Sequence, residues 1–356
     1  MITLDSLLQD ASSFIFSEFG FDIEKSKLKP YSPQNWQKFC NVNGFDVSSS
    51  GIYIPASFSA YVRTDSPFLT SNIFHELYGH GLFVEHSRIG KLLTEIIQNN
   101  GDEKSFMFDE VNPQEQVFGI SKYNIYNYEG FAVWLEALLC EETGNAKVWN
   151  VKKEGLREDY VQLFEFFEDA ENKFSRFGLI AQMGFPKHYD GSKVLDVVKK
   201  LYGPRFDNID FIILYGSQKP ESDIDLCIVS SNSSNQYFNG WLDIAELNRE
   251  DFKNRMNNLD IALTDAMFSG KLIYGDKNIF QQYKQQIINT PISQEIIAYN
   301  RKKSELQKEY LTKYQNDERM RKLCLSYINS FSQNAEQLSL GNKPLTLKNL
   351  KELYTK

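Results

Sequence analysis

The chain has 356 residues, 42% of them apolar, and a formal net charge of −8 at pH 7. This length supports two or three domains with cores of their own. The acidic balance, without a long run of lysine and arginine, argues against general nucleic-acid binding, and no apolar stretch approaches transmembrane length. The four cysteines, Cys40, Cys140, Cys227 and Cys324, are widely scattered, and the first residues lack a signal-peptide pattern. We therefore expect a cytoplasmic protein.

Residues 51–65 alternate weakly between apolar and polar side chains, which is typical of a strand or hairpin. Thr70 or Ser71 is positioned to cap a helix that begins near Asn72. This segment leads directly into the most specific motif of the chain.

Residues 75–80 read His-Glu-Leu-Tyr-Gly-His, and three of the four histidines, His75, His80 and His86, fall within twelve residues. This clustering indicates a metal site, because a catalytic zinc needs three nitrogen or oxygen ligands and an open position for water. In the usual His-Glu-x-x-His helix the histidines lie four residues apart and the Glu acts as general base. Here they lie five apart, too far round a regular helix. A locally widened turn is therefore required, and Gly79 sits where such a distortion costs least.

Residues 128–136 read Tyr-Glu-Gly-Phe-Ala-Val-Trp-Leu-Glu and begin a predicted helix. Its broad apolar face is formed by Phe131, Trp134, Leu135, Leu138 and Leu139, and Gly144 is its predicted stop. Glu129 and Glu136 lie two turns apart and share one face of this helix.

The segment 75–80 resembles the His-Glu-x-x-Gly-His segment of the dipeptidyl peptidase III family. The segment 128–136 is similar to a motif of some bacterial gluzincin peptidases. The resemblance covers these two short windows. It implies that His75, His80 and Glu129 bind Zn²⁺, that Glu76 is the general base, and that the substrate is a peptide. It also implies that the strand edge before the helix pairs with the extended substrate backbone.

Three assignments near this site stay open. Glu136 is expected to support a histidine, with an exchange of Glu129 and Glu136 as ligand as the alternative. His86 either orients a ligand, stabilises an oxyanion or faces solvent at the helix end. Any of four nearby tyrosines is a possible oxyanion donor: Tyr78, Tyr123, Tyr126 and Tyr128.

Residues 211–229 predict two apolar strands joined by a Gly-Ser turn and a short polar connection, after a helix at 192–202 that ends at Gly203-Pro204. Because successive side chains of a strand point to opposite faces, Asp223 and Asp225 lie on one side of the second strand, where both can bind a hard divalent cation. Gly216 allows the backbone to approach a phosphate, and Ser217 can donate a hydrogen bond to it.

This Gly-Ser, spacer, Asp-x-Asp pattern is similar to the motif of the nucleotidyltransferase superfamily, which includes polymerase-beta-like enzymes, kanamycin nucleotidyltransferase and the minimal nucleotidyltransferases. The resemblance implies a third carboxylate on a later strand, Mg²⁺, and in-line attack on the alpha-phosphate of a nucleoside triphosphate, expected to be ATP. Asp260, at the start of the apolar run 258–265, is the predicted third carboxylate, and Asp243 is its rival. Only five residues separate Ser217 from Asp223, which predicts a shortened helix after the Gly-Ser turn.

The expected fold class is α+β and multidomain. Residues 1–188 are expected to form a mostly helical gluzincin-like metallopeptidase region with a small sheet, and residues 189–280 an α/β nucleotidyltransferase core. Residues 281–356 form a helical appendage, with helices expected at 293–313, 317–338 and 346–354. By position the appendage resembles the helical partner of minimal nucleotidyltransferase toxin–antitoxin pairs, whose ribonuclease motif needs a histidine. No histidine follows His188, so we do not expect that activity.

These patterns together predict a bifunctional enzyme. One half would move a nucleoside monophosphate from a nucleoside triphosphate to an unknown small-molecule or protein acceptor with Mg²⁺, and the other would hydrolyse peptides with Zn²⁺. Neither membranes nor nucleic acids are expected partners. The alternative is that one half is catalytically inactive and acts as a regulatory or scaffolding module for the other.

Overall fold

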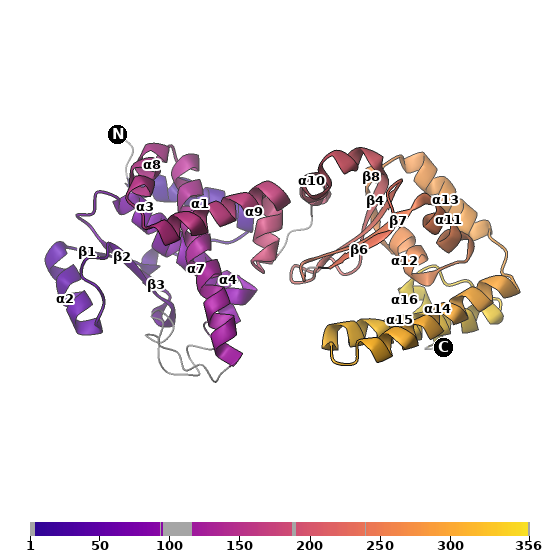
Figure 1. Cartoon of the computed structure of the whole chain (residues 1–356). Helices are drawn as coiled ribbons and strands as arrows, with labels where there is room; N and C mark the ends of the chain where they lie inside the picture. The colour runs from indigo at the N-terminus through magenta and orange to yellow at the C-terminus, as the bar shows by residue number, and fades with distance from the viewer. Residues whose placement is uncertain (1–3, 93, 95–115, 187–189, 239, 355–356) are drawn as a thin grey trace. The chain divides into compact units, whose positions relative to one another are not determined.

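The computed structural model describes residues 4–92, 94, 116–186, 190–238 and 240–354. The chain divides into two compact units, residues 1–189 and 190–356, coloured indigo to magenta and rose to yellow in Figure 1. The division falls one residue beyond the end predicted for the first region. Helices make up most of the described residues in both units, and each unit contains one sheet.

A small three-stranded sheet follows the first helix of unit 1. Its strands are β1 (Leu28–Tyr31), β2 (Gly51–Ile54) and β3 (Ser59–Arg63), in the order β1-β3-β2. Strands β2 and β3 pair antiparallel, so the hairpin predicted in this part of the chain is confirmed. Helix α2 (Pro33–Asn43) packs on β1 and β3, and helix α1 (Leu4–Phe19) packs on the later helix α7.

One continuous helical stretch follows the hairpin. Helix α3 (Leu69–Ile73) runs into a π-helical segment, Phe74–His80, which runs into α4 (Gly81–His86). A π-helix has a wider turn than an α-helix, with hydrogen bonds spanning five residues. The widened turn predicted between the two histidines is therefore confirmed. The predicted cap is wrong, because the helix begins earlier, after Phe68, without a side-chain cap, and Ser71 lies inside it.

Three longer helices complete unit 1: α7 (Gln116–Glu142), α8 (Ala146–Glu154) and α9 (Glu158–Gln182). Helix α7 packs against the π-helical segment and α9. A Cβ atom at Gly79 would lie 2.7 Å from the Cα atom of Ala132, so only glycine allows the two backbones to approach this closely.

The core of unit 1 is rich in aromatic rings, and the apolar face predicted on α7 is buried in it. Phe131 of α7 contacts Phe19, Phe83 and Phe185, with ring centroids 6.1, 5.5 and 5.2 Å away. Burial of each ring contributes about 1.5–3 kcal/mol. This cluster therefore fixes α7 in place beside the π-helical segment. Gly144, with φ of 75°, follows the end of α7 as predicted.

Unit 2 is built on a five-stranded sheet in the order β6-β7-β5-β4-β8. Its strands are β4 (Ile209–Tyr215), β5 (Ile224–Ser230), β6 (Asn235–Phe238), β7 (Leu242–Asn248) and β8 (Lys271–Gly275). Strands β5 and β7 pair parallel, and the other neighbours pair antiparallel. The two apolar strands predicted around the Gly-Ser turn are confirmed as β4 and β5.

Helices cover both faces of this sheet. Helix α10 (Gly191–Tyr202) ends where predicted, and the Tyr202 hydroxyl donates to Glu246 of β7, which places α10 over the face that carries Glu246. On the opposite face, Leu247 of β7 shares one core with three helices that come after β7 in the chain. These helices are α11 (Arg249–Asn257), α12 (Ile261–Ser269) and α13 (Lys277–Asn289).

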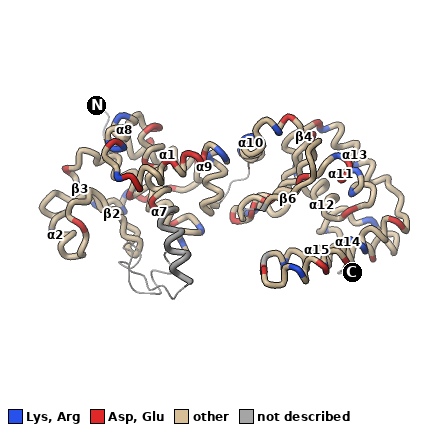
Figure 2. The backbone as a smooth tube through the Cα atoms, in the orientation of Figure 1, with Lys and Arg blue, Asp and Glu red and all other residues tan. Residues whose placement is uncertain are grey.

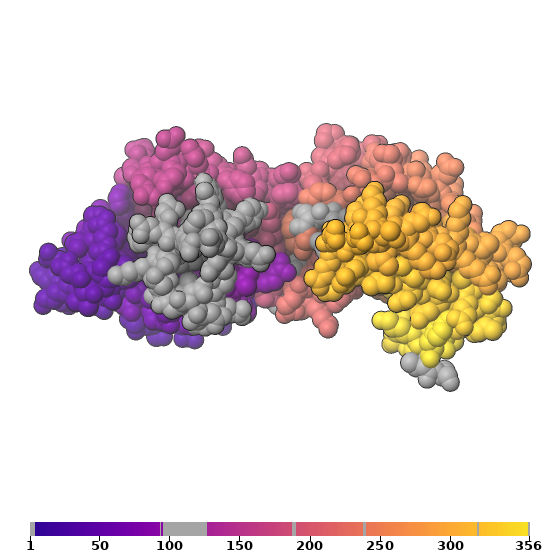
Figure 3. Space-filling view, turned by 60° about the horizontal axis from the view of Figure 1, so that its bottom comes forward, coloured from indigo at the N-terminus to yellow at the C-terminus, as the bar shows by residue number. Residues whose placement is uncertain are grey.

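The three helices predicted for the C-terminal part are present as α14 (Gln294–Lys313), α15 (Glu318–Ser339) and α16 (Leu347–Tyr354). Helices α14 and α15 pack side by side, and both signs of charge occur along them (Figure 2). In the space-filling view their orange and yellow atoms form one continuous surface with α16 (Figure 3). Ile297 and Leu338 join the same core as Phe211 of β4, so these helices belong to one compact unit with the sheet.

Candidate functional sites

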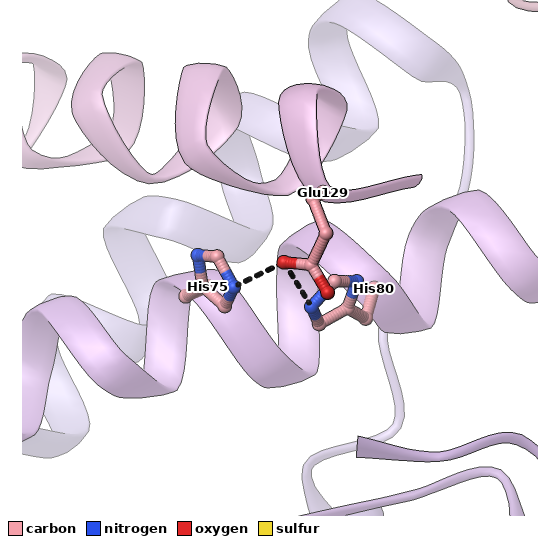
Figure 4. A group of neighbouring side chains, drawn as sticks. All are labelled: His75, His80 and Glu129. Carbon is pink, nitrogen blue, oxygen red and sulfur yellow. Dashed lines mark ion pairs between the residues drawn. The ribbon is translucent and has the colours of Figure 1, made fainter. Parts of the chain in front are cut away.

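Two histidines and a glutamate meet beside the π-helical segment (Figure 4). The Nε2 atoms of His75 and His80 each lie 3.6 Å from the same oxygen, Oε2 of Glu129 on α7. One donor atom from each residue lies within 4.8 Å of the others. The structure therefore brings together the three predicted ligands, and a set of two imidazole nitrogens and one carboxylate oxygen fits a zinc ion.

The π-helical turn explains how two histidines five residues apart reach one point. In a regular α-helix, His80 would be rotated by about 140° from His75. The wider turn brings their ring centroids to 4.7 Å, with the rings at 88° to each other. The unusual spacing in the sequence is therefore matched by an equally unusual local helix.

Glu136 orients His75 through the ring nitrogen that does not face Glu129. Its Oε2 atom accepts a hydrogen bond from Nδ1 of His75 at 3.0 Å, which leaves Nε2 of the ring for a ligand. The other oxygen accepts hydrogen bonds from Ser71 and, at 2.5 Å, from Nζ of Lys152. Glu136 is thus the predicted support for a histidine. Lys152 was not predicted as part of this site, because it lies on α8 and no spacing in the sequence connects it with either motif.

Two tyrosines line the cluster, and one of them, Tyr128, is among the four predicted candidates. The Tyr160 hydroxyl of α9 donates to Oε2 of Glu129 at 3.3 Å, and no motif marks this residue. The Tyr128 ring stacks on His80 with centroids 3.9 Å apart. Tyr78 instead donates to the backbone oxygen of Leu8, away from the cluster. The side chains of two further candidates, Tyr123 and Tyr126, lie outside the described residues.

Glu76 is buried beside the edge of the small sheet, with 8% of its surface exposed. A Cβ atom at Gly51 of β2 would lie 2.7 Å from its Oε1 atom, so the strand backbone passes against the carboxylate. Burial raises the pKa of Glu76 to about 7, which suits a general base near neutral pH. The His86 ring stacks on Phe21, with ring centroids 4.1 Å apart.

The charges in this cluster differ sharply from residue to residue. Burial lowers the pKa of His80 to about 3, so its ring is neutral at pH 7. Burial opposes ionisation of Glu129, but the adjacent protonated His75 outweighs burial and keeps the pKa of Glu129 below its usual value. Burial also opposes a charge on His75, yet the adjacent carboxylates of Glu129 and Glu136 raise its pKa to about 10. A metal at this site must therefore displace a proton from His75.

Three aspartates meet where the interior strands β5 and β7 of the unit 2 sheet begin. Carboxylate oxygens of Asp223, Asp225 and Asp243 lie within 4.8 Å of one another. Asp225 of β5 is directly opposite Asp243 of β7 in the parallel pairing, and Asp223 lies two residues before Asp225, so alternation puts all three on one side. Three carboxylates at this distance fit a hard divalent cation such as magnesium.

The prediction that Asp260 is the third carboxylate of this group is wrong, and its rival Asp243 takes that place. Residues 261–269 form helix α12 and not a strand, and Asp260 is the helix cap, with Oδ1 accepting hydrogen bonds from the backbone of Ala262 and Leu263. Its Oδ2 atom accepts a hydrogen bond from the Tyr299 hydroxyl, and the residue is fully buried.

The Gly-Ser turn lies directly against this cluster. Gly216 has φ of 76°, and a Cβ atom there would lie 2.1 Å from Oδ2 of Asp225, so both conformation and space require glycine. Between Ser217 and Asp223 the chain forms a turn closed by a hydrogen bond from Ser222 to Lys219, with no helix. The helix expected at this turn is therefore lost, not merely shortened.

Residues 199–279 match the family model described as "Polymerase beta, Nucleotidyltransferase". The match includes the Gly-Ser turn and the three clustered aspartates, so the chain contains a domain of the nucleotidyltransferase type. Unit 1 lies outside the match, and no curated protein matches the chain.

Among the described residues, no helix is both long and apolar enough to span a membrane. The cytoplasmic location remains a prediction.

Proposed function

We propose that the chain is a two-site enzyme. Unit 2 transfers a nucleoside monophosphate from a nucleoside triphosphate to an acceptor, and unit 1 hydrolyses a peptide bond at a zinc site. The first activity is supported above all by the meeting of Asp223, Asp225 and Asp243 beside Gly216 inside the matched nucleotidyltransferase domain. The second is supported by the three-ligand cluster with a buried carboxylate, Glu76, beside it.

The transfer requires a site that holds a triphosphate in line with an acceptor. Asp223, Asp225 and Asp243 would hold Mg²⁺, which neutralises charge on the phosphates when bound. Gly216 gives the phosphates access to the backbone, and Ser217 donates a hydrogen bond to them. The acceptor oxygen forms a bond to the alpha-phosphorus while the bond to the bridging oxygen breaks. Pyrophosphate leaves with that electron pair, and a carboxylate of the cluster receives the acceptor proton.

The hydrolysis would use the residues around the π-helical segment. His75, His80 and Glu129 would hold zinc, which acts as a Lewis acid when bound. Glu76 takes a proton from the attacking water and returns it to the departing peptide nitrogen. Strand β2 lies at the edge of its sheet and passes against Glu76 at Gly51, which suits pairing with an extended peptide.

The transfer is tested with ATP labelled at the alpha-phosphate, Mg²⁺ and the full chain. Asp243→Asn should reduce transfer of label by about a hundredfold or more, because it removes charge from the metal site. Asp276→Asn is the matched control, since Asp276 caps α13 away from the cluster and asparagine caps as well. Equal transfer by both variants would refute the assignment of Asp243.

The hydrolysis is tested with Glu76→Gln on a quenched peptide library. This variant should keep about one zinc per chain and lose about a hundredfold or more in rate, since it removes only the base. His80→Ala should lose the zinc itself. A Glu76→Gln protein without zinc would show instead that Glu76 is a ligand.

A second candidate function is that unit 2 binds nucleotide without transferring it and regulates unit 1. The turn between Ser217 and Asp223, which lacks the expected helix, favours this alternative, because helix N-termini contribute to phosphate binding. Binding of Mg²⁺–ATP with no transfer to any acceptor, together with a nucleotide-dependent change in peptide hydrolysis, would identify it.

A further inference from the structure

A cavity of about 610 Å³ lies in unit 2 between the sheet and the C-terminal helices. Strands β6 and β7 line one side, and α14, α15 and the end of α11 line the others. Ala245 lines the cavity two residues beyond Asp243 on the same face of β7. Tyr327 of α15 also lines it, and burial and the charges of Asp260, Asp225 and Asp243 raise the pKa of this tyrosine. The cavity therefore begins beside the carboxylate cluster.

The cavity lies on the side of the carboxylates opposite to the Gly-Ser turn. Gly216 follows β4, Asp225 lies on β5, Asp243 lies on β7, and the cavity extends from β7 to β6, in the spatial order of the sheet. In an in-line transfer, the attacking and leaving oxygens approach the phosphorus from opposite sides. Because the Gly-Ser turn would hold the triphosphate, the cavity lies on the acceptor side.

The lining of the cavity is positively charged. Arg255 of α11 and Lys303 of α14 both line it, and neither forms an ion pair in the part of the chain that the structure describes. Lys303 is partly buried, and burial and the charge of Arg255 lower its pKa more than the charges of Asp260 and Asp251 raise it. Glu246 also lines the cavity, but its carboxylate lies on the opposite face of the sheet, where it accepts hydrogen bonds from Tyr202 and Ser230. Two neighbouring cations without a carboxylate partner favour an anionic ligand.

The remaining walls are aromatic and apolar. Tyr310 and Tyr314 line the cavity near the end of α14, and Leu306 and Leu323 add apolar surface. Lys313 supplies a third positive charge beside these rings. Tyrosine rings stack on flat heterocycles, and the volume lies within the range of sites for small ligands.

We propose that this cavity binds the acceptor of the nucleotidyl transfer, and that this acceptor is a phosphorylated small molecule with an aromatic ring, about the size of a mononucleotide. The inference rests on the transfer proposed for unit 2 and adds the class of its acceptor. Arg255 and Lys303 bind the phosphate by charge-assisted hydrogen bonds, and the tyrosines bind the ring. An acceptor hydroxyl at the Asp243 end attacks the alpha-phosphorus, gives its proton to the carboxylates and displaces pyrophosphate.

The test measures acceptor binding by calorimetry on the full chain, with the nucleotide site first saturated by Mg²⁺ and a nonhydrolysable ATP analogue. AMP should bind at least about ten-fold more tightly than adenosine, which lacks the phosphate, and than ribose 5-phosphate, which lacks the aromatic ring. Lys303→Met should weaken AMP binding by about ten-fold or more without changing affinity for the analogue. Lys308→Met is the matched control, since Lys308 lies on the same helix but is 54% exposed and pairs with Glu305.

The order of additions separates the two proposals. A wild-type protein that does not bind the Mg²⁺–analogue complex would contradict the transfer itself. Binding of the analogue with no AMP binding, or with equal affinity for AMP and adenosine, would overturn only the acceptor inference. A Lys303→Met protein that loses the analogue and AMP equally would assign the cavity to the triphosphate instead.

Discussion

Asp243 and Asp260 occupy the same position in two copies of one tetrapeptide, Leu-Asp-Ile-Ala. In the first copy the tetrapeptide lies on β7, paired between β5 and β6, and its aspartate meets Asp223 and Asp225. The second copy lies between helices α11 and α12. Leu259 has φ of 48°, which is not a helical conformation, and the aspartate that follows it caps α12. The role of each carboxylate is therefore decided by pairing partners outside the tetrapeptide.

At the residue scale, this difference predicts different effects for two alanine substitutions. Asp260→Ala should lower the free energy of unfolding by about 1–3 kcal/mol, because a helix cap is lost and the Tyr299 hydroxyl loses its buried acceptor. Without metal, Asp243→Ala should lower the free energy of unfolding by less than Asp260→Ala does, since it relieves repulsion among carboxylates. It should, however, abolish stabilisation by Mg²⁺–ATP. Urea unfolding and thermal shifts measure the two effects, and the reverse pattern would return Asp260 to the metal site.

The pKa of His75 predicts how zinc binding depends on pH. Its pKa is raised to about 10, so the metal-free protein carries a proton there that zinc must displace. Zinc affinity should therefore rise with pH, by about ten-fold per unit between about pH 6 and pH 8. Chelator competition measures this slope. Glu136→Gln removes a charge that holds the proton, so it should flatten the slope, and a pH-independent wild type would contradict the proton displacement.

At the scale of elements, the contact between the π-helical segment and α7 sets the zinc site. Glu129 reaches the two histidines only because α7 lies directly on this segment, and that approach depends on Gly79. The segment thus needs a widened turn to align the histidines and a glycine to admit the helix that carries the third ligand.

Gly79→Ala should therefore disturb the site without changing a ligand. Its Cβ atom would lie 2.7 Å from Cα and 2.8 Å from Cβ of Ala132, so α7 must move. We expect a loss of about 1–3 kcal/mol in stability and weaker zinc retention. Gly81→Ala is the matched control, because the nearest atom to its Cβ, on Tyr53, lies at an ordinary 3.5 Å. Elemental analysis after dialysis, with urea unfolding, compares the two, and equal zinc retention would contradict this explanation.

At the scale of the whole molecule, each candidate site is built within one compact unit. His75, His80 and Glu129 all lie in unit 1, and the three clustered aspartates lie in unit 2. The helices after residue 281 do not form a third body, because Ile297 and Leu338 complete the core under the sheet.

This organisation predicts that the two sites lose their ligands independently. His75→Ala should remove zinc but keep the rise in thermal stability produced by Mg²⁺–ATP, and Asp225→Asn should do the reverse. Zinc content and thermal unfolding of both variants measure this. Loss of both ligands in either variant would show that the sites are coupled.

The sequence by itself determined the features that depend on local spacing. The five-residue interval between His75 and His80 predicted a widened turn, because helix geometry fixes how far each residue rotates. Alternation placed Asp223 and Asp225 on one side of a strand. Helical periodicity predicted the three C-terminal helices, since each pattern lies within a single element.

Only the tertiary structure decided which distant residues join these local groups. Lys152 donates a hydrogen bond to Glu136, and Tyr160 donates one to Glu129. Both contacts depend on the packing of separate helices, which the spacing of residues in the sequence does not predict. Asp243 joins Asp225 because β7 pairs with β5, whereas the identical tetrapeptide around Asp260 begins a helix. The acceptor cavity likewise exists only where the sheet and the C-terminal helices meet. Contacts between elements depend on strand order and helix packing, and these are properties of the folded chain as a whole.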